Sequence, residues 1–175
     1  DLDGLRIRSQ PIYNSFFESL GAIPVSVPVP DVYTGLERHT FDGSGWPIVA
    51  IKDLSWDKFL RYRIDPGFFQ TDLAVVVNPA KWDSLSDQDK AAINSISGET
   101  MSAAWGKNFD IQNPAAYKKL AAAGNEIVDA SPELVAAVDA VYDTMVADWI
   151  VAAKAAGVED PAAMLAFYNE TYKAL

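Results

Sequence analysis

The chain has 175 residues, of which 50% are hydrophobic and 22% charged, and its net charge is −10. A chain of this length can bury a substantial core, and its composition differs from that of a disordered protein. The acidic residues are spread along the sequence, which disfavours binding to nucleic acid or anionic lipid through a general positive field. The absence of cysteine excludes disulfides, thiol nucleophiles and thiolate metal sites. An anionic ligand would therefore need a local cation, which directs attention to single arginines.

The first part of the chain alternates short apolar strands with helical patterns. We expect strands at residues 5–8 and 23–27, a helix at 11–20 that Gly21 ends, and a second helix from an Asp31 N-cap to about Arg38. This order of elements predicts an α/β fold with a small mixed sheet flanked by helices.

The middle of the chain contains three further segments with a recognisable pattern. Residues 47–54 have a helical pattern, and residues 57–64 read as a strand with a basic face. After the turn signal Asp65-Pro-Gly67, residues 72–77 are apolar enough to form a strand inside a sheet.

From Ser86 onward the pattern is mostly helical. Ser86 and Asp89 resemble a capping box, and Pro114 is expected to kink or break the long helix that follows. A short strand is expected at 126–129, then a helix with Ser131 as N-cap that ends before Gly157, and a last helix from Pro161 to about Lys173. Apolar residues recur at helical spacing in these last two helices and are expected to be core: Leu134, Val138, Val141, Met145, Trp149, Leu165, Tyr168 and Tyr172.

Arg8 is the strongest single candidate for binding an anion. It ends a strand in a short α/β unit, and such strand ends are where α/β folds commonly bind ligands. A guanidinium matches a carboxylate with two parallel donors and stays charged when partly desolvated. Judged from composition alone, the alternative is an ordinary arginine on the surface of an acidic protein.

A series of motifs, taken in order, resembles the second lobe of the DctP-type solute-binding proteins of TRAP transporters. They are Leu5-Arg-Ile-Arg8, Leu20-Gly-Ala22, Pro24-Val25, Asp31-Val-Tyr33, Asp42-Gly43 and Val75-Val-Val-Asn78, followed by Trp82 and the helix opening at Ser86. The resemblance implies one lobe of a two-lobed periplasmic binding protein with long C-terminal helices, and it implies that the N-terminal lobe is absent from this chain. Residues 1–56 would be the ligand-binding lobe, 57–78 the cross-lobe connecting strands, and 79–175 a helical part that packs on the lobe.

The same resemblance assigns roles to individual residues. Arg8 would clamp the carboxylate of an organic acid, and Gln10, Gly43, Phe69 and Gln70 would also face the ligand. Trp46 stands where many family members have a ligand-binding asparagine, which favours a ligand with an aromatic or apolar body. The alternative for Trp46 is a core residue that anchors the helix after Pro47.

The resemblance also implies no bound metal and no other cofactor. Gln70 and Gly45 stand where the keto-acid-binding branch of the family has acidic residues beside a cation. Hard cations usually need carboxylate ligands, so the loss of both acidic residues argues against a metal.

An enzyme is not expected from these residues. Gly43-Ser-Gly45 lacks the spacing of a nucleophile elbow, and the single histidine, His39, reads as a surface or capping residue. Asp42 or Asp72 could act as a base, but no activated nucleophile or metal accompanies either of them.

We therefore expect a periplasmic TRAP solute-binding component whose partners are an organic acid, the TRAP membrane permease subunits and its own N-terminal lobe, with no nucleic acid. The alternative is a helical interaction or self-association domain without a small-molecule ligand, in which the fragment could form a homodimer.

Overall fold

The computed structural model describes residues 2–69 and 73–173, which form two compact units. The first unit consists of Asp1–Gly45 together with Asp129–Leu175, and the second consists of Trp46–Val128. The two units are defined by packing within the chain, and they do not show which residues bind a ligand. The expected functional division into residues 1–56, 57–78 and 79–175 stays a prediction.

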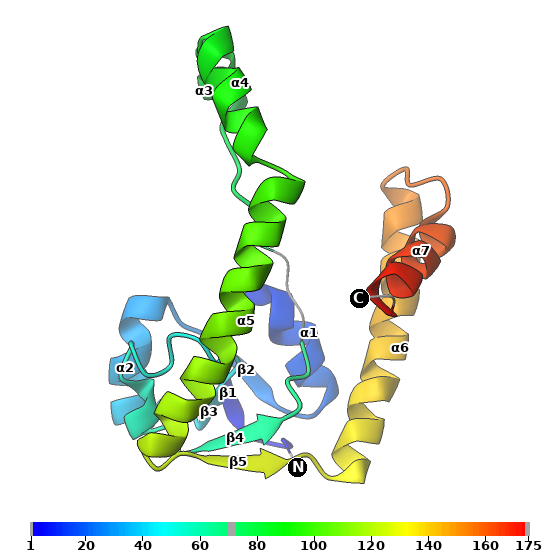
Figure 1. Cartoon of the computed structure of the whole chain (residues 1–175). Coiled ribbons are helices and arrows are strands. Elements are labelled where there is room, and N and C mark those ends of the chain that lie inside the picture. Colours follow the sequence, from blue (N-terminus) through cyan, green and yellow to red (C-terminus); the bar gives the residue numbers. More distant parts are fainter. Residues whose placement is uncertain (1, 70–72, 174–175) are drawn as a thin grey trace. The chain divides into compact units, whose positions relative to one another are not determined.

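The first unit is built on a three-stranded parallel sheet in the order β2-β1-β3 (Figure 1). The central strand is β1 (Arg6–Ser9), flanked by β2 (Ile23–Ser26) and β3 (Gly43–Ser44). The strands expected at 5–8 and 23–27 are thus confirmed to within one residue. β3 was not predicted, because a strand this short shows no alternation of apolar and polar residues.

Two helices connect these strands. The helix predicted after β1 is confirmed as α1 (Pro11–Ser19). α2 (Val29–Glu37) begins earlier than expected, with Pro28 in the N-cap position, so the prediction of Asp31 as N-cap is wrong. Asp31 instead lies in the first helical turn, where a negative charge is favourable, and proline is also tolerated in that turn. The core beside the sheet consists of Ile7, Phe16, Val32, Leu36 and Phe41.

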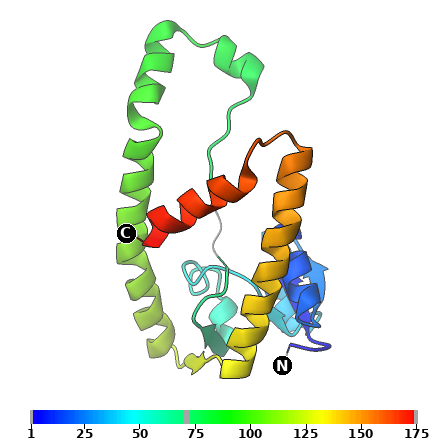
Figure 2. The same cartoon turned by 90° about the vertical axis from the view of Figure 1, so that its right-hand side faces the viewer.

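The first unit also contains the two C-terminal helices. α6 (Pro132–Ala155) is capped as predicted, because the Ser131 side chain accepts a hydrogen bond from the backbone N–H of Leu134 at 3.2 Å. α6 packs on α1 through Phe16 and Tyr142, whose stacked rings lie 5.6 Å apart. α7 (Pro161–Lys173) turns back from the far end of α6 (Figure 2).

The apolar stripe of these helices is only partly buried. Val138 and Val141 are core residues, as expected. The same expectation is wrong for Trp149, Tyr168 and Tyr172, which are exposed. A stripe of apolar residues shows which face of a helix can be buried, but burial also requires a neighbouring element over that face.

In its described residues, 46–69 and 73–128, the second unit contains a two-stranded sheet, three α-helices and a short 3-10 helix. β4 (Tyr62–Asp65) pairs with β5 (Glu126–Asp129), a strand predicted with the same bounds. The helices are α3 (Pro79–Asp83), α4 (Asp87–Ile96) and α5 (Glu99–Ala122).

The ends of these helices confirm one prediction and correct another. The Ser86 hydroxyl caps α4 by accepting from the N–H of Asp89 at 3.1 Å, as the capping box predicts. The same hydroxyl donates to Asp89 Oδ2 at 2.7 Å, whereas in a full capping box the backbone N–H of the N-cap residue is the donor to that side chain. The break expected at Pro114 is wrong, because α5 continues through this residue. The helical run is interrupted instead at Gly98, whose φ of 62° cannot continue a right-handed helix.

Three expectations for the middle of the chain are also wrong. Residues 47–54 form turns rather than a helix, with Ala50 in the left-handed region at φ 77°. The strand expected at 57–64 is shortened to β4, because a 3-10 helix, Trp56–Lys58, occupies its start. Of the strand expected at 72–77, residues 73–77 have no regular structure. Asp72 lies outside the described residues. None of the helices in the described ranges is both long and apolar enough to cross a bilayer.

Candidate functional site

Arg8 is buried at the carboxyl-terminal part of β1, with 1% of its surface exposed. Its Nε and Nη2 both donate to the carbonyl oxygen of Val27, at 3.1 and 2.9 Å, which fixes one edge of the guanidinium. Desolvation on burial lowers the pKa of Arg8, and the nearby Tyr13 acts in the opposite direction. An arginine stays charged despite such a lowered pKa. The sheet therefore holds a positively charged guanidinium in a fixed orientation and in low-dielectric surroundings.

Arg6, two residues earlier on the same strand, is paired with a carboxylate of the chain itself. Its Nη2 lies 2.8 Å from Asp42 Oδ1, while its backbone N–H donates to Asp42 Oδ2 at 2.9 Å. The hydrogen bond from the Arg6 side chain is the main cause that lowers the pKa of Asp42 to about 2. A carboxylate with this pKa is a weak base at neutral pH, which argues against Asp42 as a catalytic base.

β3 places Ser44 directly beside Arg8. The two strands are parallel, and Arg8 is the register partner of Ser44. Side chains of register partners lie on the same face of a sheet, so the hydroxyl of Ser44 is on the guanidinium face. Ser44 Oγ is buried and has no hydrogen-bond partner within residues 2–69 and 73–173. From the sequence, Ser44 is considered only as a catalytic nucleophile and rejected, because the spacing of a nucleophile elbow is absent. Nothing local in the sequence reveals that Ser44 is the register partner of Arg8.

The glycines on either side of Ser44 lie close to side chains of the same unit. A Cβ on Gly43 would lie 3.1 Å from Ile7 Cδ1, and one on Gly45 would lie 2.9 Å from two ring atoms of Phe17. The N–H of Gly45 also donates to the carbonyl of Arg8 at 3.0 Å. Close contacts with the core therefore explain both glycines, and the ligand contact expected for Gly43 stays a prediction.

The remaining predicted residues are distributed over both units. Gln10 occupies the N-cap position of α1, and its side chain makes no capping hydrogen bond. In the second unit, Trp46 packs edge to face on the buried Trp56 with ring centroids 5.2 Å apart, but no helix follows Pro47 for it to anchor. Phe69 is partly buried, and Gln70 lies outside the described residues.

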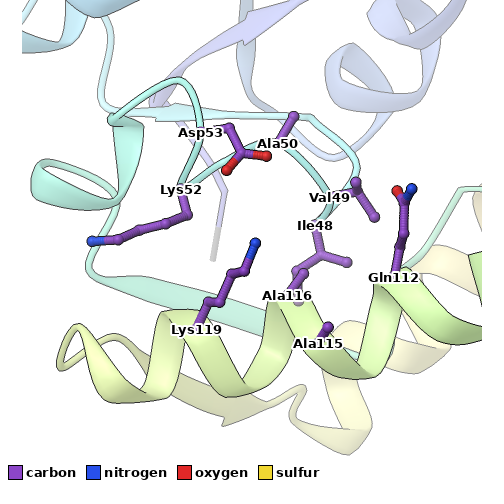
Figure 3. Close-up of a pocket in the computed structure, with 9 residues that line it drawn as sticks. All are labelled: Ile48, Val49, Ala50, Lys52, Asp53, Gln112, Ala115, Ala116 and Lys119. Carbon is purple, nitrogen blue, oxygen red and sulfur yellow. The ribbon is translucent and has the colours of Figure 1, made fainter.

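A small cavity that the sequence did not predict lies within the second unit, between the turns at residues 48–53 and α5 (Figure 3). Its volume is about 240 Å³, and Asp53 and Lys119 point toward one another across it. Lys52, at its edge, pairs with the buried Asp57, with 2.6 Å between Nζ and Oδ2. Ligand pockets are typically about 300–1,000 Å³, so this cavity has room for only a small polar molecule.

Within the part of the chain that the structure describes, no group of three or more His, Cys, Asp or Glu side chains could hold a metal ion.

Comparisons with known proteins agree on one family. The family model described as bacterial extracellular solute-binding protein, family 7, matches residues 1–151. The 2,3-diketo-L-gulonate-binding periplasmic protein YiaO of Escherichia coli (strain K12) is 34% identical over 101 residues, which are 57% of this chain and 31% of that protein.

Solved structures extend the likeness over almost the whole chain. A TRAP periplasmic solute-binding protein from Bordetella bronchiseptica, with bound (R)-mandelate and (S)-mandelate, is 28% identical with a TM-score of 0.82, and the match covers 99% of this chain and 56% of that one. A marine metagenome TRAP solute-binding protein specific for aromatic acid ligands, in complex with metahydroxyphenylacetate, is 25% identical with a TM-score of 0.73, covering 90% of this chain and 51% of that one. The matched parts cover from 31% to 56% of the length of these relatives, and the chain as a whole spans about half the length of the two solved structures.

Proposed function

The chain belongs to the bacterial extracellular solute-binding proteins of family 7, and on this premise we propose that it forms part of the solute-binding component of a TRAP transporter, with Arg8 as the residue that binds an organic carboxylate. The burial of Arg8 at the end of β1 is the observation that carries the proposal. A buried guanidinium with a fixed orientation is well suited to a planar anion, because a carboxylate accepts two of its hydrogen bonds in parallel.

The two solved relatives suggest the class of ligand. One has bound mandelate and the other metahydroxyphenylacetate, and both of these molecules join a carboxylate to an aromatic ring. Trp46 remains the predicted contact for the ligand body, and Gln10, Gly43, Phe69 and Gln70 remain predicted ligand contacts. We therefore place aromatic carboxylates first among the ligands to be tested.

The whole receptor would work outside the cytoplasm, without catalysis, and would deliver its ligand to the membrane permease subunits. It would contain a further lobe beyond the part represented here, consistent with the share of each relative that this chain matches. Closure of two lobes over a ligand requires higher affinity for the closed state, so this chain alone should bind weakly. Family membership does not favour the alternative of a self-association domain without a ligand.

The test measures ligand binding by the whole receptor that contains this chain. Mandelate and metahydroxyphenylacetate are titrated in thermal-shift and calorimetric experiments, each with its methyl ester as the uncharged counterpart. We expect at least one carboxylate to raise the melting temperature and its ester to have no effect. If no carboxylate in a wider panel of aliphatic and aromatic acids binds, the proposal is wrong.

A matched pair of arginine variants then tests the role of Arg8. Arg8→Gln should weaken carboxylate binding roughly 100-fold or more, because it removes the buried partner of a charged group. Arg6→Gln removes the same charge from the same strand, but Arg6 is already paired with Asp42, so affinity should change little. Equal affinity of Arg8→Gln and the parent protein would show that the carboxylate is bound elsewhere.

A further inference from the structure

Ser44 is unusual in that its hydroxyl is buried but makes no hydrogen bond with any residue that the structure describes. Buried hydroxyl groups are nearly always paired, because an unpaired one loses its hydrogen bonds to water and gains none in return. Alanine has almost the same shape and would avoid this loss. A serine here therefore reduces the stability of the ligand-free chain.

The position of Ser44 indicates what its hydroxyl could bind. Ser44 is the last residue of β3 and the register partner of Arg8, so its side chain and the guanidinium stand on the same face of the sheet. Neighbouring strands lie about 4.8 Å apart, so the backbones that carry Ser44 and Arg8 are adjacent. The adjoining Gly45 is hydrogen-bonded to the backbone of Arg8 and packed against Phe17, which fixes the end of β3.

We propose that the Ser44 hydroxyl donates a hydrogen bond to the ligand carboxylate held by Arg8 and is thereby a specificity-determining residue of the site. This inference rests on the proposed function. The guanidinium can only donate, and the hydroxyl can also donate, so the two together favour a group with two acceptor oxygens. A carboxylate supplies both acceptor oxygens and a charge opposite to that of the guanidinium, whereas a primary amide supplies one acceptor oxygen and no charge.

Ser44→Ala in the whole receptor is the main test, with affinity and stability measured separately. Removal of a hydrogen bond to a charged group should lower the affinity for the carboxylate roughly tenfold to 100-fold. The melting temperature of the ligand-free receptor should stay the same or rise, because a buried unpaired hydroxyl is removed. Ser44→Cys, which is somewhat larger and supplies a weaker donor, should have an intermediate affinity.

Ser19→Ala is the matched control. Ser19 lies at the far end of α1 and its hydroxyl donates to the carbonyl of Ser15 at 2.8 Å, so its loss should leave carboxylate affinity unchanged. The same titration with the amide of the ligand measures specificity. Its affinity relative to the carboxylate should rise in Ser44→Ala, because the favoured second donor is gone.

The outcomes separate this inference from the proposed function. If Ser44→Ala binds the carboxylate as tightly as the parent while Arg8→Gln does not, Ser44 has no role in binding and the proposed function stands. If Ser44→Ala lowers the melting temperature of the ligand-free receptor and leaves affinity unchanged, the hydroxyl is structural and the inference is overturned. If no carboxylate binds the parent receptor, both proposals are wrong.

Discussion

Two segments that were both predicted to be strands, β1 and residues 73–77, have opposite structures. β1 lies between β2 and β3, and three of its four residues, including Arg8, are buried. Residues 73–77 are more apolar, yet they form no strand, and Leu73, Val75 and Val76 are 69%, 81% and 87% exposed. The presence of neighbouring strands distinguishes the first segment from the second, because a strand is stable only when its backbone groups are paired.

This difference shows that an apolar pattern predicts which residues can be buried but not what will cover them. If the two-lobed receptor proposed above is correct, its further lobe should pair with and cover residues 73–77. Buried and exposed residues of the chain should therefore respond differently to the same substitution. The predictions below follow from this comparison.

Phe41→Ala should have the largest effect on stability. Phe41 is buried beside the sheet, and its truncation should lower the free energy of unfolding by about 3–5 kcal/mol, since it removes transfer energy and leaves a cavity. Urea denaturation of the 175-residue chain measures this. Phe167→Ala, on the exposed face of α7, should change it by less than about 0.5 kcal/mol. Similar losses in both variants would contradict the burial pattern.

The next largest difference in stability is expected between two glycine-to-alanine substitutions in helices. In Gly35→Ala the new Cβ would overlap the ring of Phe41, so we expect a loss of about 1–3 kcal/mol in the free energy of unfolding. Gly106 in α5 has no atom within 4 Å of a Cβ, so Gly106→Ala should stabilise by about 0.5–1 kcal/mol through helix propensity. The two variants should move the urea midpoint in opposite directions, and a shift in the same direction would contradict the packing of Gly35.

A smaller effect should depend on pH through the ion pair beside β1. The pKa of Asp42 is lowered from 3.8 to about 2 in the folded chain, mainly by the hydrogen bond from Arg6. Because the folded pKa is below the unfolded one, the stabilisation is present above about pH 4 and is lost as the pH falls toward 2. Asp42→Asn should remove this part of the pH dependence of unfolding, whereas Glu18→Gln, at an exposed carboxylate of the same unit, should not. An unchanged pH profile for Asp42→Asn would show that the pair contributes no stability.

Val76→Ala should have the smallest effect in this chain and a larger one in the whole receptor. Val76 is exposed here, so we expect a change below about 0.5 kcal/mol in the free energy of unfolding. If the rest of the receptor covers this residue, the same substitution there should destabilise by about 1–2 kcal/mol, from the lost burial of two methyl groups. Equal effects in the two proteins would show that residues 73–77 remain uncovered.

Local signals in the sequence predicted several elements well. The Ser86 and Ser131 caps form the expected hydrogen bonds, and β5 has the predicted bounds. These features depend on contacts between residues three or four positions apart, or on a short run of suitable residues. The prediction of a helix at 47–54 was wrong because Ala50 adopts a left-handed conformation, which alanine itself does not signal.

The candidate site could be predicted only in part. Arg8 was selected from its place at the end of a strand and from the family resemblance, but its burial and its hydrogen bonds to Val27 depend on β2 and the residues that follow it. Ser44 was not selected, since its importance arises from its register with a residue 36 positions earlier. The cavity between residues 48–53 and α5 likewise joins segments far apart in the chain.

The sequence by itself determined the family and the order of most elements, because motifs, caps and apolar runs are local properties of the chain. Tertiary structure decided which apolar segments are buried, which arginine is paired with a carboxylate of the chain, and which side chain stands beside Arg8. Register and burial depend on contacts between distant segments, and these contacts appear only when the strands are assembled. The difference between β1 and residues 73–77 has this same physical origin.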